Sequence, residues 1–218
     1  MDAYYEAVQS SQHCQRNWDL SKQIPQAHKD VILYSASECP SKQNIAFYRI
    51  HAIEDRELQE KIYNITESVP GNKKYNAQVL ANWLLVFQEI KTSNRYNRIV
   101  SMTSKKTIGK GTPWNLENPE QGLTQQFINR RRDVNLSIGI ASGYANLTAN
   151  QLGYKTGYCA CFNDLELTQL LGLDEEEPVV LTLGIGFPQQ DKQWFEEHYP
   201  VSENRWTYDK EVIDIIHK

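Results

Sequence analysis

Long apolar runs are absent from this 218-residue sequence. A helix that spans a membrane needs about 18 consecutive apolar residues, and no stretch approaches that length, so we expect no membrane partner. The sequence begins with MDAYYEAVQSSQ, which has an acidic side chain at position 2 and no apolar core. No secretory signal peptide is therefore predicted.

Charge of one sign is not in excess either. The sequence has 23 Lys and Arg against 27 Asp and Glu, a formal net charge of −4. It therefore lacks the excess of positive charge that would favour binding to a phosphate backbone, and we expect no nucleic-acid partner. A hydrophobic content of 40% is normal for a chain with a sizeable core, and the length favours a single domain, 1–218.

Cysteine is scarce, with four residues at positions 14, 39, 159 and 161. Cys159 and Cys161 are too close in sequence for an ordinary disulfide framework, and a chain of this size does not need one. We therefore expect a reduced, cytoplasmic setting. A closed zinc site needs four ligands, and these two thiols have no second pair nearby, so no metal site is predicted.

The usual nucleotide motifs are also missing. LGIGFP, at 183–188, has two glycines but neither the third glycine nor the helix start of a dinucleotide fingerprint. TIGKGTP, at 107–113, has the wrong spacing for a Walker loop.

Hydrophobic periodicity predicts a series of helices and strands. Strands are expected at 46–53, 81–90 and 178–188, and helices at 4–12, 25–38, 54–65 and 189–198. Pro25 is expected at a first helical position. Helices that flank one sheet without strict alternation of strand and helix indicate an α+β domain.

The longest helical signal is a stripe of residues that step by four and three. Its members are Val134, Ile138, Ala141, Ala145, Thr148 and Leu152. Gly139 and Gly143 lie on a neighbouring line and would let another backbone approach closely. The pattern lapses over 91–120 before this helix, which predicts a long excursion, and such loops are usually functional or mobile.

Several motifs are weak alone but occur once each, in one order, over nearly the whole chain. They are QHCQRNW (12–18), PSKQN (40–44), KKYNAQVLANWLLVF (73–87), ANQLGYKTGYCACF (149–162), LGIGFP (183–188) and ENRW (203–206). This ordered set resembles the FMN-dependent nitroreductase family. The resemblance implies a central, mostly antiparallel sheet wrapped by helices in an intertwined homodimer, with FMN sites shared across the interface. Gly139 and Gly143 would lie at that interface, 91–120 would form a lid, and 200–218 would form an arm on the partner.

The resemblance also implies how the flavin phosphate is held. A phosphate carries negative charge and prefers cationic, bidentate donors, and the family pattern assigns this role to Arg16 and Arg205, with His13 as a helper. Gln12 and Cys14 stand where the family has arginine and serine. Since both are poorer donors for an anion, the phosphate contact is expected to shift toward Arg16, His13 and the tail.

The remaining motifs imply contacts with the flavin ring. Pro40, Ser41, Lys42 and Asn44 would reach the ring or ribityl chain across the dimer interface, although such a turn can also simply end a helix. Asn76 would contact the pyrimidine edge.

Two further contacts of the ring follow from the family pattern. Gln78 or Val79 stands near the position of a family lysine beside flavin N1. Tyr158, Cys159 and Ala160 would pass the N5 edge, where the Ala160 backbone N–H would bond N5; an ordinary core strand explains the same residues.

The implied activity is hydride transfer from NAD(P)H through flavin N5 to an oxidised acceptor, such as a nitroaromatic or a quinone, by a ping-pong mechanism. Because the flavin does the chemistry, no catalytic acid or base is assigned. Three alternatives remain open: a specialised flavoenzyme of the same fold (dehalogenase-like, flavin-degrading or azoline-oxidising), a non-enzymatic FMN-binding or storage protein, and a relative that has lost FMN.

Overall fold

The computed structural model describes residues 2–12, 14–41, 46–67, 76–90, 119–189 and 215–216, and within 119–132 the helical backbone alone. The helices are α1 (Asp2–Ser10), α2 (Gln26–Ser37), α3 (Arg56–Ile65), α5 (Pro119–Gln151) and α6 (Asp164–Leu170), with a short 3-10 helix η2 (Ala77–Leu80). The strands are β1 (Tyr48–Ile53), β2 (Trp83–Glu89), β3 (Lys155–Cys159) and β4 (Val179–Gly186). Residues 91–118 of the predicted excursion, the predicted helix after 189 and the arm apart from 215–216 lie outside the described residues.

The four strands form one sheet in the order β1-β2-β4-β3. Every neighbouring pair is antiparallel, with Ala52 opposite Leu85 between β1 and β2, and Tyr158 opposite Leu183 between β3 and β4. β1 and β3 are therefore the two edge strands of this sheet. The predicted α+β class with an antiparallel sheet is confirmed.

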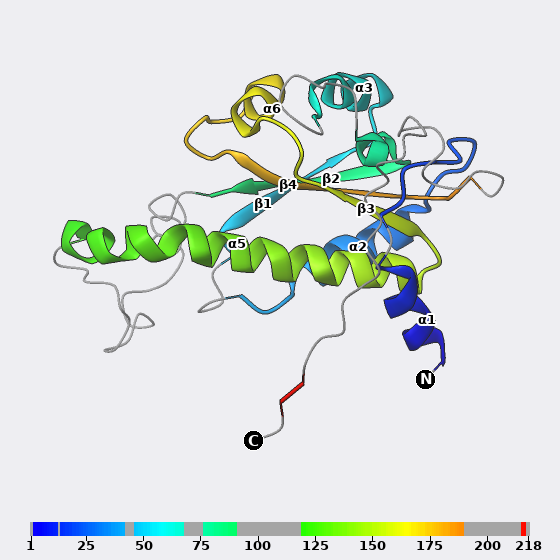
Figure 1. Cartoon of the computed structure of the whole chain (residues 1–218), viewed down its shortest axis with the longest axis horizontal. Coiled ribbons are helices and arrows are strands. Elements are labelled where there is room, and N and C mark those ends of the chain that lie inside the picture. Colours follow the sequence, from blue (N-terminus) through cyan, green and yellow to red (C-terminus); the bar gives the residue numbers. More distant parts are fainter. Residues whose placement is uncertain are drawn as a thin grey trace.

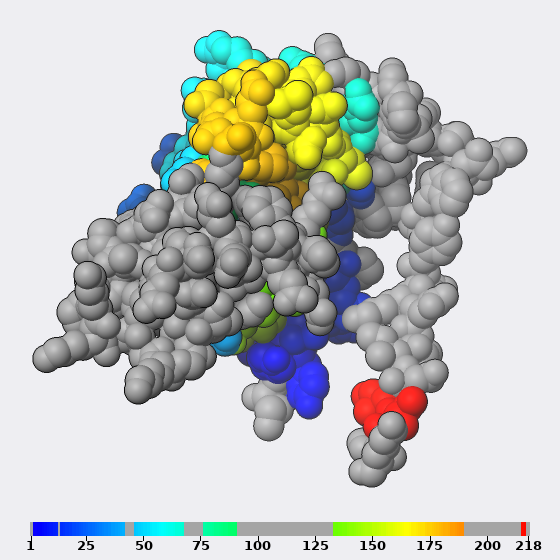
Figure 2. Space-filling view, turned by 90° about the vertical axis from the view of Figure 1, so that its left-hand side faces the viewer, coloured from blue at the N-terminus to red at the C-terminus, as the bar shows by residue number. Residues whose placement is uncertain are grey.

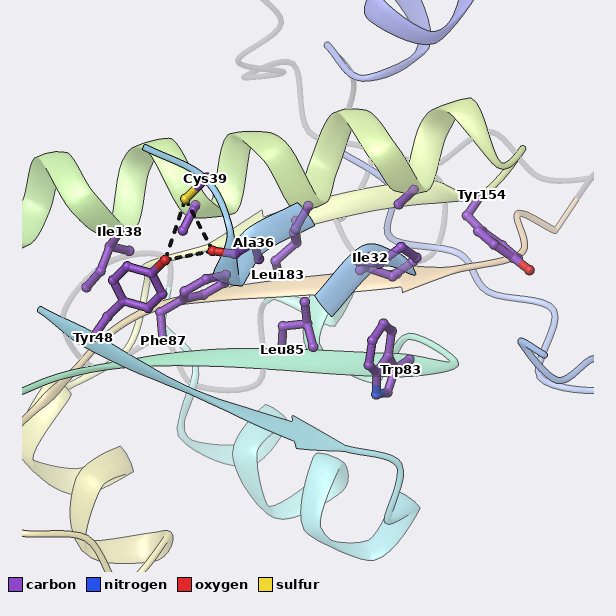
Figure 3. Packing of buried hydrophobic residues seen from close by; sticks show 14 of the residues in the cluster. Ile32, Ala36, Cys39, Tyr48, Trp83, Leu85, Phe87, Ile138, Tyr154 and Leu183 are labelled. Atoms are coloured by element: carbon purple, nitrogen blue, oxygen red, sulfur yellow. Dashed lines mark hydrogen bonds between the residues drawn. The ribbon is translucent and has the colours of Figure 1, made fainter. Parts of the chain in front are cut away.

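Helices cover both faces of the sheet, α2 and α5 on one and α3 and α6 on the other (Figure 1). β2 is apolar along its length because its successive side chains enter the two layers alternately. Trp83, Leu85 and Phe87 belong to the core cluster under α2 and α5, and they lie in a row along the strand in Figure 3. Leu84 and Val86 belong to the second cluster, under α3 and α6. In the space-filling view, the region of α6 (yellow) lies at the top and the first residues of the chain (darkest blue) lie below the centre (Figure 2).

The predicted stripe of α5 faces the sheet. Val134, Ile138, Ala141 and Ala145 are buried, but Thr148 is only half-buried and Ala149 takes its place in the core. The other side of the same helix is exposed. It carries three large apolar side chains, Leu136, Ile140 and Tyr144, and two glycines, Gly139 and Gly143. Along the described helices, no segment has the length and apolar character needed to cross a bilayer.

The starts of two helices show how local sequence sets their bounds. Pro25 is the N-cap of α2 and not its first helical residue, since its ψ of 142° is extended. Its carbonyl oxygen accepts hydrogen bonds from the backbone N–H groups of His28 and Lys29. In α3, the Asp55 side chain accepts from the N–H groups of Glu57 and Leu58, a cap that stabilises a helix by about 1 kcal/mol.

Candidate functional site

The chain that follows α1 lies against the edge strand β3. The Gln15 N–H donates to the Thr156 carbonyl at 2.8 Å, and the Cys14 thiol donates to the Tyr158 carbonyl at 3.4 Å. These two contacts lie on either side of Gly157, so residues 14 and 15 run beside the middle of β3. Burial raises the pKa of the Cys14 thiol, and the Arg16 charge opposes that rise.

Gly157 permits this close approach. A Cβ at this position would collide with the Gln15 carbonyl oxygen and would lie 3.0 Å from both Cβ and Cγ of Gln78. Gly157 is absent from the predicted site residues, although a glycine inside a strand often marks a close approach of another backbone. It is therefore the residue on which three separate parts of the chain converge.

Gln78 and Asn76 bring a third segment to the same place. The Gln78 amide nitrogen donates to the Tyr158 carbonyl at 3.2 Å and lies 3.5 Å from the Asn76 amide oxygen. The Asn76 amide nitrogen donates to the Glu67 carbonyl at 3.0 Å, which fixes that side chain. Gln78 and Asn76 are both buried. Of the two residues predicted near flavin N1, Gln78 faces β3, whereas Val79 packs in the cluster under α3 and α6.

Tyr158 contributes its carbonyl oxygen here, and its side chain points elsewhere. That oxygen receives the Cys14 and Gln78 donors. The phenol hydroxyl donates instead to the Ser142 carbonyl of α5 at 2.8 Å. A main-chain contact of this kind leaves the side chain free to serve in packing.

Cys159, Ala160 and Cys161 form the end of β3 and the chain just beyond it. Cys159 is 2% exposed, whereas Ala160 and Cys161 are exposed. A hydrogen bond from the Cys159 thiol, the backbone N–H of Ala160 and the Arg16 charge together lower the pKa of Cys161 to about 6, against the opposing effect of burial. The same thiol pairing, together with burial, raises the pKa of Cys159.

These contacts bring half of the predicted residues together. We call the set the β3-edge cluster: Cys14, Arg16, Asn76, Gln78, Tyr158, Cys159, Ala160 and Cys161. Cys161 was not among the predicted site residues, although its separation of two residues from Cys159 is visible in the sequence. Within the described ranges, no three His, Cys, Asp or Glu side chains gather as metal ligands.

Two predicted residues lie at the opposite edge of the sheet. Pro40 and Ser41 follow Cys39, whose thiol donates to the Ala36 carbonyl at 3.2 Å and lies 3.5 Å from the Tyr48 hydroxyl. Tyr48 begins the edge strand β1, and Figure 3 shows it with Cys39 at one end of the core and Tyr154 at the other. Pro40 is exposed and Ser41 is half-buried. Ser41 therefore does not join the β3-edge cluster of its own chain.

The structure says little about the five remaining predicted residues. Gln12 is exposed just after α1, where its N–H donates to the Gln9 carbonyl at 3.4 Å, and its predicted role stays a prediction. Four residues assigned to the flavin lie outside the described residues: His13, Lys42, Asn44 and Arg205.

Comparisons with known proteins place the chain in a family. The model of the nitroreductase family matches residues 10–187. No curated protein matches the sequence. A protein of Staphylococcus epidermidis, named as a candidate NAD(P)H:FMN oxidoreductase, has a similar structure with a TM-score of 0.62 at 21% identity, over 87% of this chain and 89% of that one.

Two further solved structures share the fold. A candidate nitroreductase of Exiguobacterium sibiricum, solved in complex with FMN, has a TM-score of 0.60 at 16% identity over 87% of this chain and 90% of that one. Nitroreductase A of Vibrio parahaemolyticus has a TM-score of 0.60 at 17% identity over 96% and 79%. The family match covers most of the sequence and the fold agrees with it, so this chain belongs to the nitroreductase family.

Proposed function

We propose that this protein is an FMN-dependent oxidoreductase that takes hydride from NAD(P)H and passes it to a small oxidised acceptor. The observation that carries the proposal is the β3-edge cluster, in which Cys14, Gln78 and Tyr158 meet from three distant segments. Each of those segments is one that the family resemblance assigns to the flavin. The cytoplasmic setting expected from the cysteine content stays a prediction.

The residues present fit a flavin ring. The Gln78 amide oxygen is buried and has no hydrogen-bond partner among the described residues. Because a buried acceptor without a donor is costly, turning this amide toward a ligand would give that oxygen a donor in exchange for the nitrogen's bonds to Tyr158 and Asn76. Arg16 supplies positive charge on the same side, since it acts on both Cys14 and Cys161. A ring with donor and acceptor edges and an anionic phosphate matches these groups.

When bound, FMN supplies the hydride chemistry at N5, and the protein supplies position and charge. In the proposal Asn76 and Gln78 orient the pyrimidine edge, and Arg16 offsets negative charge on the cofactor. Ala160 would offer its backbone N–H at the N5 edge. No side chain is assigned as an acid or a base, and one pocket serving donor and acceptor in turn would give ping-pong kinetics.

The proposal includes a homodimer with shared sites. Ile140 and Tyr144 are 39% and 47% exposed on α5, beside Gly139 and Gly143, where an added Cβ would meet nothing within 4 Å. An exposed apolar helix face with room for a backbone suits a subunit interface. In a dimer, Ser41 of one subunit would reach a flavin held by the β3-edge cluster of the other subunit. It does not join the cluster of its own chain.

The test is an anaerobic reduction experiment on the full chain loaded with FMN. We expect the flavin absorbance to stay with the protein through gel filtration and to bleach on adding NADPH or NADH. A retained flavin that neither nucleotide bleaches would contradict the oxidoreductase and favour a flavin-binding protein.

A further inference from the structure

Cys159 and Cys161 form a pair of thiols with very different surroundings. The two cysteines are separated by one residue, Ala160, where the chain leaves β3, and alternate residues of an extended chain point to the same side. Cys159 is 2% exposed and packs in the core cluster under α3 and α6, whereas Cys161 is exposed. One cysteine of the pair is therefore accessible to small molecules, and the other is shielded from them.

Three groups stabilise negative charge on the accessible sulfur. The Cys159 thiol, the Ala160 backbone N–H and the Arg16 charge each lower the pKa of Cys161. Since the thiolate is the nucleophilic form of cysteine, Cys161 is the attacking group and Cys159 keeps its proton. A low-pKa, exposed cysteine next to a second cysteine is the arrangement that suits reversible oxidation.

We propose that Cys159 and Cys161 are a dithiol that hydroperoxides oxidise to a disulfide at the edge of the candidate flavin site. The Cys161 thiolate attacks the distal oxygen of the peroxide, the O–O bond breaks, and Cys161 sulfenic acid forms while the remaining oxygen leaves as an alcohol or water after protonation. The Cys159 sulfur then attacks the Cys161 sulfur, and hydroxide leaves and takes up the Cys159 proton as water. The peroxide is reduced by two electrons and the thiol pair is oxidised by two.

The resulting bridge closes a very small loop, Cys159-Ala160-Cys161. Disulfides with unfavourable geometry are more easily reduced than structural ones, so the bridge is expected to be reversible by an ordinary dithiol. The small, exposed Ala160 between the two cysteines leaves room for the chain to bend. A reversible bridge agrees with the size of the chain, which needs no structural disulfide.

Oxidation would change the flavin edge, a consequence that rests on the proposed function. In the reduced protein the Ala160 N–H helps to lower the pKa of Cys161, and this is the same donor that the proposal assigns to flavin N5. A neutral disulfide sulfur is a weaker acceptor than a thiolate. The oxidised pair would therefore release this N–H, and the thiol pair would tune the flavin site according to peroxide exposure.

The test counts thiols and measures mass in the full chain, with and without FMN, after treatment with hydrogen peroxide at a small molar excess. We expect two of the four thiols to disappear, the mass to fall by two hydrogen atoms, and peptide mapping to place the bridge between Cys159 and Cys161. A dithiol reductant should restore both thiols. Because the readout needs no flavin, failure of FMN binding would leave this result standing.

Single variants separate the two roles. Cys161→Ser, at an exposed position, should abolish the rapid oxidation, and Cys159→Ala should stop it at a sulfenic acid that dimedone traps. Cys159→Ser, checked for its unfolding transition, covers the case in which the alanine variant folds poorly. Cys39→Ser is the matched control, and it should still form the bridge. Persistence of all four thiols, or a bridge that involves Cys14, would overturn the proposal.

Discussion

The Gln78 amide nitrogen donates a hydrogen bond to the Tyr158 carbonyl at 3.2 Å, and so joins two residues that are 80 positions apart. The Cys14 thiol donates to the same oxygen from the N-terminal segment. One backbone oxygen thus holds together three parts of the chain. The proposed flavin contacts depend on that junction.

Replacing Gln78 by alanine tests the junction. Loss of a buried hydrogen bond costs about 1 kcal/mol or more, and we expect FMN affinity to fall by about tenfold. Gln59→Ala is the matched control, because Gln59 is equally buried and donates to the Ala81 carbonyl at 3.0 Å, away from β3. Both variants should lose stability in urea unfolding, but only Gln78→Ala should lose FMN affinity in a fluorescence titration. Equal FMN binding by the two variants would contradict the role of Gln78.

Arg16→Gln tests the assignment of the phosphate. A hydrogen bond to a charged group is worth about 1.5 to 3 kcal/mol, so FMN affinity should fall by about tenfold or more. Riboflavin, which lacks the phosphate, should bind wild type and variant alike. Lys61→Gln is the control, since Lys61 lies on the exposed side of α3 with Glu57 as its partner. If riboflavin binding falls as much as FMN binding, Arg16 acts on the ring and the phosphate assignment is wrong.

The depressed pKa of Cys161 predicts an unusual pH profile for its alkylation. The pKa is lowered to about 6 by the Cys159 thiol, the Ala160 N–H and Arg16, so the thiolate forms on going up through that pH. Reaction with iodoacetamide, followed by peptide mass spectrometry, should reach half its plateau near pH 6. Cys14, whose pKa burial raises, should react only at much higher pH. A Cys161 profile with its midpoint in the ordinary thiol range would contradict this prediction.

The exposed face of α5 predicts the oligomeric state. Ile140→Asp places a charge on the proposed interface and should convert a dimer to monomers in light scattering at micromolar concentration. Leu165→Asp is the matched control, because Leu165 is 45% exposed on α6 at the opposite side of the sheet. A wild-type chain that is monomeric at these concentrations would contradict the shared-site proposal.

Much of the fold can be predicted from the sequence because its signals are periodic. The apolar run of β2 is buried on both faces, and the α5 stripe follows the helical repeat. Positions whose burial or helical role is decided within a single turn are harder to predict. Pro25 suits both a cap and a first helical residue, and Thr148 and Ala149 lie side by side at the margin of one stripe.

The candidate site likewise has a part that can be predicted from the sequence and a part that cannot. Cys14, Asn76 and Tyr158 can be placed through the family motifs, but no pattern decides which of Gln78 and Val79 faces β3 within a four-residue 3-10 helix. The distance between Ser41 and the cluster depends on the strand order, which places β1 and β3 at opposite edges. The effect of Cys159 on the pKa of Cys161 depends on side-chain orientation at the end of a strand.

The most direct test of the central claim is an equilibrium titration of the folded, flavin-free chain with FMN, followed by flavin fluorescence. The account predicts saturable binding of one FMN per chain, with flavin that stays bound through gel filtration. A chain that is folded by circular dichroism yet shows no saturable binding of FMN would contradict it.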